Sequence, residues 1–152
     1  FILPIEFNEK NRSTIKNNIK TTRVAKKHLE NGGLLIIFPS GGVTVAENKK
    51  SAQNNDDWKL FASKLVKQTK TDVIPIYFDG KNGFLFNLFA SKLKSQTLKY
   101  SSYIHETKKK IGKDIIIYTG EVIKYHEIEH INDRTILTNY LKTKTYNLAG
   151  NE

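Results

Sequence analysis

Residues 34–44 read Leu-Leu-Ile-Ile-Phe-Pro-Ser-Gly-Gly-Val-Thr, an unbroken apolar run that stops at a proline and opens into a glycine pair. A continuous apolar run of this length is typical of a strand covered on both faces. Gly41 and Gly42 have no Cβ, so the backbone there can form a plain tight turn or approach an anion closely. Ligands of open α/β sheets bind at the carboxyl ends of strands. The segment therefore predicts a buried strand over 34–38 that leads into a binding site.

Strand-like and helix-like segments alternate on both sides of this run. Apolar runs predict further strands over residues 2–7, 73–78 and 115–118. Helical spacing or continuous apolar character predicts helices over residues 11–31, 58–66, 84–93, 98–110 and 133–148. Strands that alternate with helices indicate crossover connections. We therefore expect an α/β fold, with a mainly parallel central sheet flanked by helices, in a single domain over residues 1–152. The strands 34–38 and 73–78 should run parallel.

The chain is basic and contains no cysteine. Its 25 Lys and Arg residues outnumber 15 Asp and Glu residues, which gives a formal net charge of +10. Such a charge attracts polyanions such as nucleic acid, acidic lipid surfaces or phosphorylated carriers, and it also arises from a composition bias that favours lysine. The absence of cysteine excludes thiolate zinc sites and a cysteine nucleophile. The mean hydropathy is -0.48, and no run approaches the roughly 20 apolar residues of a membrane span.

Five short blocks resemble one enzyme family. FPSGGV over residues 38–43 resembles the FPxG motif of the PlsC-like lysophospholipid acyltransferase superfamily, most closely the bacterial subgroup with FP-small-G-x-V-S/T. VIPIYFDGKN over residues 73–82 is similar to the VVPVYFxGxN block of that family. Similarity continues in Trp58 with Phe61, in YIHE over 103–106, and in the closing pattern from Ile111-Gly112 to GEVI at 120–123. The blocks occur in the order of the family and cover most of the chain from Asn11 to Ile123.

The resemblance implies a glycerolipid acyltransferase-like fold and a fatty acyl transfer reaction. The acyl donor would be acyl-CoA or acyl carrier protein, and the acceptor a lyso-lipid hydroxyl in membrane lipid synthesis. It implies no cofactor, no metal and no nucleic acid partner, and a peripheral location on the cytoplasmic face of the inner membrane. The implied substrate-binding residues are Phe38, Pro39, Ser40, Gly41, Gly42, Val43 and Pro75, with the glycine pair shaping the acceptor pocket.

The chain departs from the family at the catalytic base and at the acceptor phosphate. The base of the family is the histidine of an H-x-x-x-x-D motif upstream of FPxG, but the residue five positions after His28 is Gly33. Phe1 also stands inside an apolar stretch. We therefore expect the C-terminal portion of an acyltransferase domain, whose N-terminal part is missing, with no catalytic residue in this chain and no activity of its own. No Arg occurs from Ser40 to Lys49, where FPEGTR members hold a phosphate, so a lyso-lipid is favoured over glycerol 3-phosphate.

Three other catalytic patterns are weaker. Ser40 as a nucleophile would need the elbow G-x-S-x-G, but Phe38 stands two residues before it. HEIEH over residues 126–130 has the letters of the zinc motif H-E-x-x-H, which requires one helix through both histidines. His105 and Glu106 are helix neighbours that point about 100° apart, so they do not form a pair. His28 is expected to be a solvated helix residue among lysines.

Lysines and aromatic residues from 84 to 110 support the main alternative, a non-enzymatic basic module that binds lipid or nucleic acid. The apolar stretch over 84–89 suits either a core or a membrane interface, where lysines nearby would meet anionic headgroups. No RNP-like, zinc-finger or helix-turn-helix pattern accompanies these residues. Binding to DNA without lipid preference would favour the alternative.

Overall fold

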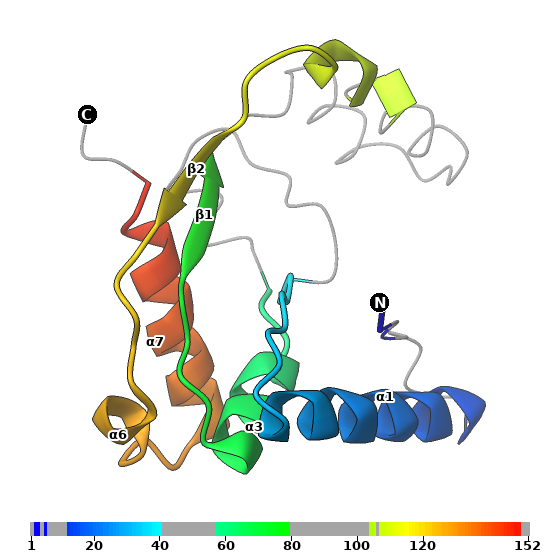
Figure 1. Ribbon diagram of the computed structural model, residues 1–152, viewed down its shortest axis with the longest axis vertical. Helices are drawn as coiled ribbons and strands as arrows, with labels where there is room; N and C mark the ends of the chain where they lie inside the picture. Colours follow the sequence, from blue (N-terminus) through cyan, green and yellow to red (C-terminus); the bar gives the residue numbers. More distant parts are fainter. Residues whose placement is uncertain are drawn as a thin grey trace. The chain divides into compact units, whose positions relative to one another are not determined.

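The structure is a computed structural model that describes residues 2, 3, 5, 12–40, 57–79, 104, 105 and 107–149 (Figure 1). The chain forms two compact units. Unit 1 comprises Phe1–Gly41, Trp58–Val73 and Val122–Tyr140. Unit 2 comprises Gly42–Asp57, Ile74–Glu121 and Leu141–Glu152. Among the described residues, no helix is both long enough and apolar enough to cross a bilayer.

The first helix of unit 1, α1, spans Arg12–Glu30 and confirms the helix predicted over 11–31. Its buried residues are Thr14, Thr21 and Ala25, which share one face because they lie seven and four residues apart. The helix ends in a Schellman motif at Asn31-Gly32-Gly33, a sequence that is typical of helix C-caps. Gly32 adopts a left-handed φ of 77°, and the Gly33 amide donates to the His28 carbonyl oxygen at 2.9 Å.

The helix α3 spans Phe61–Thr69 and packs against α1 in unit 1. It begins three residues later than the stripe from Trp58 predicts. The segment before it is held to the end of the 34–39 run instead, because the Lys59 amide donates to the Pro39 carbonyl oxygen at 2.9 Å. Leu65 and Val66 bury the apolar face of α3.

Two aspartates fix the helices in the last part of unit 1. Asp72 accepts hydrogen bonds from the amide of Tyr125, the first residue of α6 (Tyr125–Ile128), and from Lys124 Nζ, both at 2.9 Å. Asp133 caps α7 (Arg134–Tyr146) by accepting from the amides of Thr135 at 2.7 Å and Ile136 at 2.9 Å. These hydrogen bonds stabilise the ionised carboxylates.

The same contacts lower the pKa of both carboxyl groups. The Lys124 ammonium, followed by the Tyr125 amide, lowers the pKa of Asp72, and the Ile136 and Thr135 amides lower the pKa of Asp133.

The helix α7 confirms the helix predicted over 133–148. Its residues up to Tyr140 belong to unit 1 and the remainder to unit 2.

A chain of hydroxyl groups joins α7 to α3 inside unit 1. Thr138 Oγ1 donates to Ser63 Oγ at 2.7 Å, and Ser63 Oγ donates to the Leu60 carbonyl oxygen at 3.1 Å. Ser63 and Thr138 are both buried, as are the neighbouring Leu65 and Leu137. Buried hydroxyl groups cost free energy unless they are hydrogen-bonded. The pair therefore specifies how the two helices are aligned.

Unit 2 contains a two-stranded antiparallel sheet. The strand β1 (Ile76–Asp79) pairs with β2 (Ile116–Thr119), with Ile76 opposite Thr119 and Tyr77 opposite Tyr118. The Tyr77 ring lies 6.4 Å from the Tyr118 ring and 5.8 Å from the Tyr146 ring, measured between centroids. Burial raises the pKa of Tyr77, and Asp79 adds to the shift. The end of α7 therefore packs against the sheet through these tyrosine rings.

The predicted mainly parallel central sheet is wrong. Among the described residues the only sheet is β1–β2, and its strands are antiparallel. The segment 34–38 is extended but is not assigned to a strand, so its predicted parallel pairing with 73–78 is wrong as well. The strands predicted over 73–78 and 115–118 exist, with bounds shifted by one to three residues.

The solvent exposure of the apolar runs explains why the predicted sheet topology is wrong. A strand of a doubly covered parallel sheet is buried on both faces. Leu34, Ile36 and Phe38 are instead 77%, 66% and 69% exposed. Ile116 and Ile117 of β2 are also exposed. A continuous apolar run predicts an extended segment, but it predicts neither which strand that segment pairs with nor whether the pairing is parallel. The helix predicted over 84–93 and much of that over 98–110 lie outside the described residues.

We expect the hydroxyl pair to behave as a coupled unit. Ser63→Ala leaves the Thr138 hydroxyl buried without its acceptor and should lower the free energy of unfolding by about 1–3 kcal/mol. Thr138→Val should cost less, because Ser63 keeps its bond to Leu60. The double variant should be less destabilised than the two single variants added together. Urea unfolding followed by circular dichroism measures all three, and strictly additive losses would contradict the coupling.

Candidate functional site

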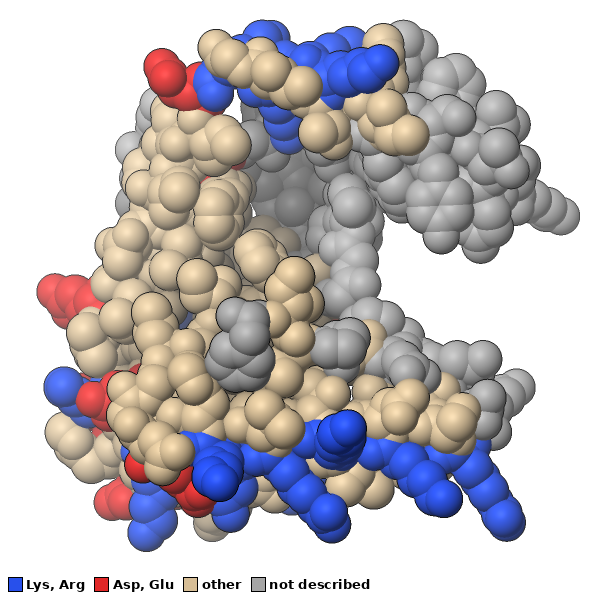
Figure 2. Space-filling model, turned by 45° about the vertical axis from the view of Figure 1, so that its right-hand side comes forward, with Lys and Arg blue, Asp and Glu red and all other residues tan. Residues whose placement is uncertain are grey.

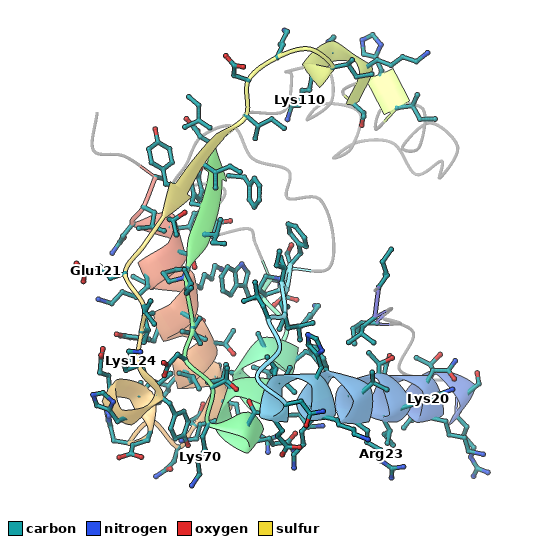
Figure 3. All side chains as sticks on the ribbon, viewed as in Figure 1. Lys20, Arg23, Lys70, Lys110, Glu121 and Lys124 are labelled. Atoms are coloured by element: carbon teal, nitrogen blue, oxygen red, sulfur yellow. The ribbon has the colours of Figure 1, made fainter. Side chains whose placement is uncertain are left out.

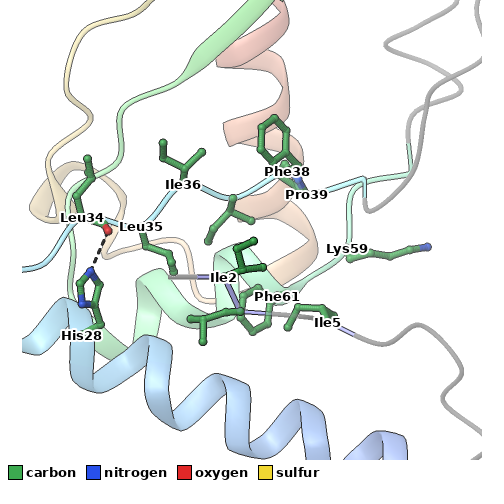
Figure 4. Close-up of a pocket in the computed structure, with 12 residues that line it drawn as sticks. Ile2, Ile5, His28, Leu34, Leu35, Ile36, Phe38, Pro39, Lys59 and Phe61 are labelled. Atoms are coloured by element: carbon green, nitrogen blue, oxygen red, sulfur yellow. Dashed lines mark hydrogen bonds between the residues drawn. The ribbon is translucent and has the colours of Figure 1, made fainter. Parts of the chain in front are cut away.

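A largely apolar pocket in unit 1 is the candidate site (Figure 4). Its cavity volume is about 730 Å³, within the range of about 300–1,000 Å³ that is usual for small-molecule sites. The lining residues are Ile2, Leu3, Ile5, His28, Leu34, Leu35, Ile36, Ile37, Phe38, Pro39, Lys59 and Phe61. Ten of these twelve side chains are hydrocarbon, so the pocket suits an apolar ligand.

One wall of the pocket is the extended segment 34–39. Successive side chains of an extended chain point to opposite sides. Leu35 and Ile37 are accordingly half-buried, whereas Leu34, Ile36 and Phe38 are exposed. The segment is fixed at one end by the Schellman turn of α1 and at the other by the hydrogen bond from Lys59 to Pro39. The wall is therefore held at both ends by backbone groups.

The opposite wall comes from two separate parts of the chain. Ile2, Leu3 and Ile5 contribute apolar side chains from the start of the chain, and Phe61 contributes an aromatic ring from the first turn of α3. Figure 4 shows Phe61 between Ile2 and Ile5. The sequence pattern predicts a strand for the first three residues and a helix for Phe61, and it places none of them in a site. For Ile2, Leu3 and Ile5 the only available signal was apolar character, which does not distinguish core from pocket, and the family resemblance of Phe61 named no binding role.

Two polar side chains stand at the pocket. His28 lies where α1 ends and donates from Nε2 to the Leu34 carbonyl oxygen at 3.0 Å. Lys59 is exposed and lies beyond Pro39 in Figure 4. The two lie at different ends of the apolar lining in that view. An ammonium at one end of a hydrocarbon wall suits a ligand with an apolar tail and an anionic group.

His28 has a structural role that the sequence did not predict. The expected solvated histidine is instead half-buried. A Cβ added to Gly33 would overlap the imidazole ring, so the ring occupies the space that a side chain at residue 33 would need. The ring thus covers the turn while Nε2 holds the first residue of the pocket wall. A Nε2 that donates to a carbonyl carries the proton, so this nitrogen does not accept a proton from a substrate.

The structure brings only some of the predicted site residues together. Phe38 and Pro39 line the pocket, and Ser40 follows them as a half-buried residue. Gly41, Gly42 and Val43 lie outside the described residues. Pro75 belongs to unit 2, where it is buried and accepts a hydrogen bond from the Gly120 amide at 2.9 Å. The predicted contribution of Pro75 to the site therefore stays a prediction.

The other histidines do not assemble a metal centre within the described ranges. The helix α6 ends at Ile128, so His126 is helical and His130 is not. One helical face therefore does not carry both histidines of HEIEH. His105 is exposed. No group of three or more His, Cys, Asp or Glu side chains that could hold a metal ion occurs among the described residues.

Comparison of the chain with protein-family models, curated proteins and solved structures found no match.

We expect the His28–Gly33 contact to control the pocket wall. Gly33→Ala should displace the imidazole, break its bond to Leu34, and lower the free energy of unfolding by about 1–3 kcal/mol. His28→Ala should suppress much of this cost, because it makes room for the new methyl group. Chemical unfolding of the single and double variants measures the coupling.

Gly32→Ala provides the matched control. A Cβ at Gly32 meets no atom within 4 Å, although φ is +77°. Its cost is therefore backbone strain alone and should be unchanged by His28→Ala. Equal coupling of His28 to both glycines would contradict the steric explanation.

Proposed function

We propose that this chain is the acyl-chain-binding portion of a glycerolipid-type acyltransferase. The enzyme would move a fatty acyl group from acyl-CoA or acyl carrier protein to the hydroxyl of a lyso-lipid. The observation that carries the proposal is the apolar pocket along residues 34–39, because this wall runs directly into the Phe38-Pro39-Ser40 segment that resembles the FPxG motif. A hydrocarbon wall that ends at the motif fits an acyl substrate.

The composition of the pocket supports an acyl chain over a polar ligand. Each methylene moved from water into an apolar site contributes about 0.8 kcal/mol. The half-buried Leu35 and Ile37, together with Phe61, offer that environment. The exposed Lys59 stands where a phosphate of the donor or of the acceptor could be met by a positive charge. A purely polar substrate would leave most of the lining unused.

The reaction sets a requirement that these residues do not meet alone. A new C–O bond forms between the acyl carbon and the acceptor oxygen, the C–S bond breaks, and the acceptor proton passes through a base to the leaving thiolate. None of the four histidines in the sequence has an aspartate five residues later. His28 is engaged through Nε2. We therefore assign binding to this chain and leave the base outside it.

The acceptor and the location follow from the same reasoning. The stretch from Ser40 to Lys49 contains no Arg, and arginine is the side chain best suited to hold a phosphate through two parallel hydrogen bonds. This favours an already acylated, more apolar acceptor. Substrates of this kind reside in membranes, so we propose a peripheral location on the cytoplasmic face of the inner membrane.

We expect affinity to rise with acyl chain length. Each added methylene should lower the Kd for an acyl-CoA about fourfold until the pocket is filled, because about 0.8 kcal/mol per methylene corresponds to that factor. Isothermal titration calorimetry with CoA and with octanoyl-, dodecanoyl- and palmitoyl-CoA, kept below their micellar concentrations, measures the series. Equal affinity for CoA and palmitoyl-CoA would rule out an acyl-binding pocket.

A pair of variants locates the site of that binding. Leu35→Gln places a polar group on the pocket wall and should weaken palmitoyl-CoA binding about tenfold or more. Ile136→Gln is the matched control, because Ile136 is 61% exposed on α7 and does not line the pocket. The control should bind as the unaltered chain does.

Turnover separates binding from catalysis. The chain by itself should leave palmitoyl-CoA intact in the presence of a lyso-lipid, because no described residue is placed as the base. Release of free CoA thiol, detected with a thiol-reactive dye, measures the reaction. Acceptor-dependent thiol release would refute the assignment of the base to another part of the enzyme. Saturable acyl binding without thiol release is the expected result.

A further inference from the structure

The outer face of α1 carries a continuous row of cations. At about 100° per residue, positions spaced by four and three fall on one narrow stripe, here about 80° of arc and about 22 Å long. We call this stripe the basic face, and its members are Arg12, Lys16, Lys20, Arg23 and Lys27. All of them are exposed. Figure 2 shows blue side chains in a row over this helix, and Figure 3 shows Arg23 projecting from it.

The basic face lies opposite the face by which α1 is buried. Thr14, Thr21 and Ala25 bury that other side, and by helical geometry they lie about 160° from the centre of the basic face. The only acidic residue of α1 is Glu30, which follows Lys27 at the C-terminal end of the stripe and pairs with Lys26 at 3.5 Å. Within the part of the chain that the structure describes, no salt bridge joins a member of the basic face to a carboxylate.

Exposed aliphatic side chains border the basic face on both sides. Ile15 and Ile19 lie on one edge and are 48% and 47% exposed, and Val24 lies on the other edge and is 40% exposed. No Asp or Glu separates them from the cations. Exposed β-branched side chains beside cations are unfavourable in water and find apolar surroundings just below the headgroups of a bilayer.

We propose that the basic face of α1 docks the protein on an anionic lipid bilayer. The cations would meet lipid phosphates at the headgroup level, while Ile15, Ile19 and Val24 would enter the upper acyl region. Charge complementarity and the aliphatic borders select this partner. Nucleic acid would use the cations but leave the aliphatic residues in water, and α1 carries no Phe, Tyr or Trp to stack on bases. This proposal identifies the surface through which the protein would contact the membrane, and it rests on the proposed function only for the choice of the inner membrane.

Vesicle co-sedimentation tests the surface. The whole chain is mixed with vesicles of phosphatidylcholine alone or of an equimolar mixture with phosphatidylglycerol. Binding should require phosphatidylglycerol and weaken as salt is added. The variant Lys16→Gln/Lys20→Gln/Arg23→Gln should bind about 100-fold more weakly, since each cation near an anionic membrane contributes about fivefold to partitioning. Unchanged binding by this variant would overturn the proposal.

A matched control separates the stripe from the net charge. The variant Lys70→Gln/Lys113→Gln/Lys144→Gln removes the same charge from exposed lysines elsewhere in the chain. It should bind nearly as well as the unaltered chain. Equal loss in both triple variants would show that only the overall charge acts, and would overturn the proposal. Far-UV circular dichroism checks that α1 remains folded in each variant.

Two further measurements separate the partners and the two proposals. Ile15→Ser/Ile19→Ser should weaken vesicle binding about tenfold or more and leave any binding to duplex DNA unchanged. Tight binding to DNA without binding to vesicles would overturn the lipid surface. Leu35→Gln should keep full vesicle binding while it loses palmitoyl-CoA, so failure of the basic face and failure of the acyl pocket give different results.

Discussion

The end of α1 is the constraint on which the pocket depends. The left-handed Gly32 and the bond from the Gly33 amide to His28 turn the chain sharply out of the helix. The His28 ring then fills the space above Gly33 and holds the Leu34 carbonyl oxygen. Because the extended segment begins at this point, the turn sets where Leu35 and Ile37 lie. A different helix end would move the whole apolar wall.

One feature links the two proposed surfaces of unit 1. The helix α1 supplies the cations of the basic face on its outer side and His28, which holds the pocket wall, at its C-terminal end. A helix is a stiff element, so its position on a membrane would fix the height of the pocket wall above the lipid. A lyso-lipid would then need to leave the bilayer only in part to reach residues 34–39. If both proposals hold, docking and substrate access would therefore depend on the same helix.

The helices could be predicted from the sequence, whereas the sheet could not. The spacing of Ile15, Ile19, Ala25 and Leu29, together with the closing glycines, determined α1 through local interactions. The α3 and α7 helices follow equally local patterns, and only the start of α3 differs because Lys59 binds Pro39. The pairing of β1 with β2 joins residues about 40 positions apart, and the apolar residues of a strand do not encode its partner. The direction and register of the β1–β2 pairing could therefore not be predicted from the sequence patterns.

The residues of the candidate site likewise fall into those that local sequence patterns predict and those that depend on tertiary packing. Phe38 and Pro39 were predicted because a motif names them, and they line the pocket. Ile2, Ile5 and Phe61 were missed because their place in the pocket depends on tertiary packing between distant segments. His28 was misinterpreted because a histidine among lysines on a helix gives no local sign that its ring covers Gly33, five residues later, and binds the Leu34 carbonyl oxygen.

The hydroxyl pair between α3 and α7 has an evolutionary consequence. Ser63 and Thr138 lie 75 positions apart in the chain but share one buried hydrogen bond. Replacement of Ser63 alone leaves the Thr138 hydroxyl without its acceptor, replacement of Thr138 alone removes one of the two hydrogen bonds of Ser63, and joint replacement by apolar residues removes the need for both. Sequences that descend from a common ancestor with this chain should therefore retain the two hydroxyls together or lose them together. The two positions form a unit of inheritance that no local sequence pattern reveals.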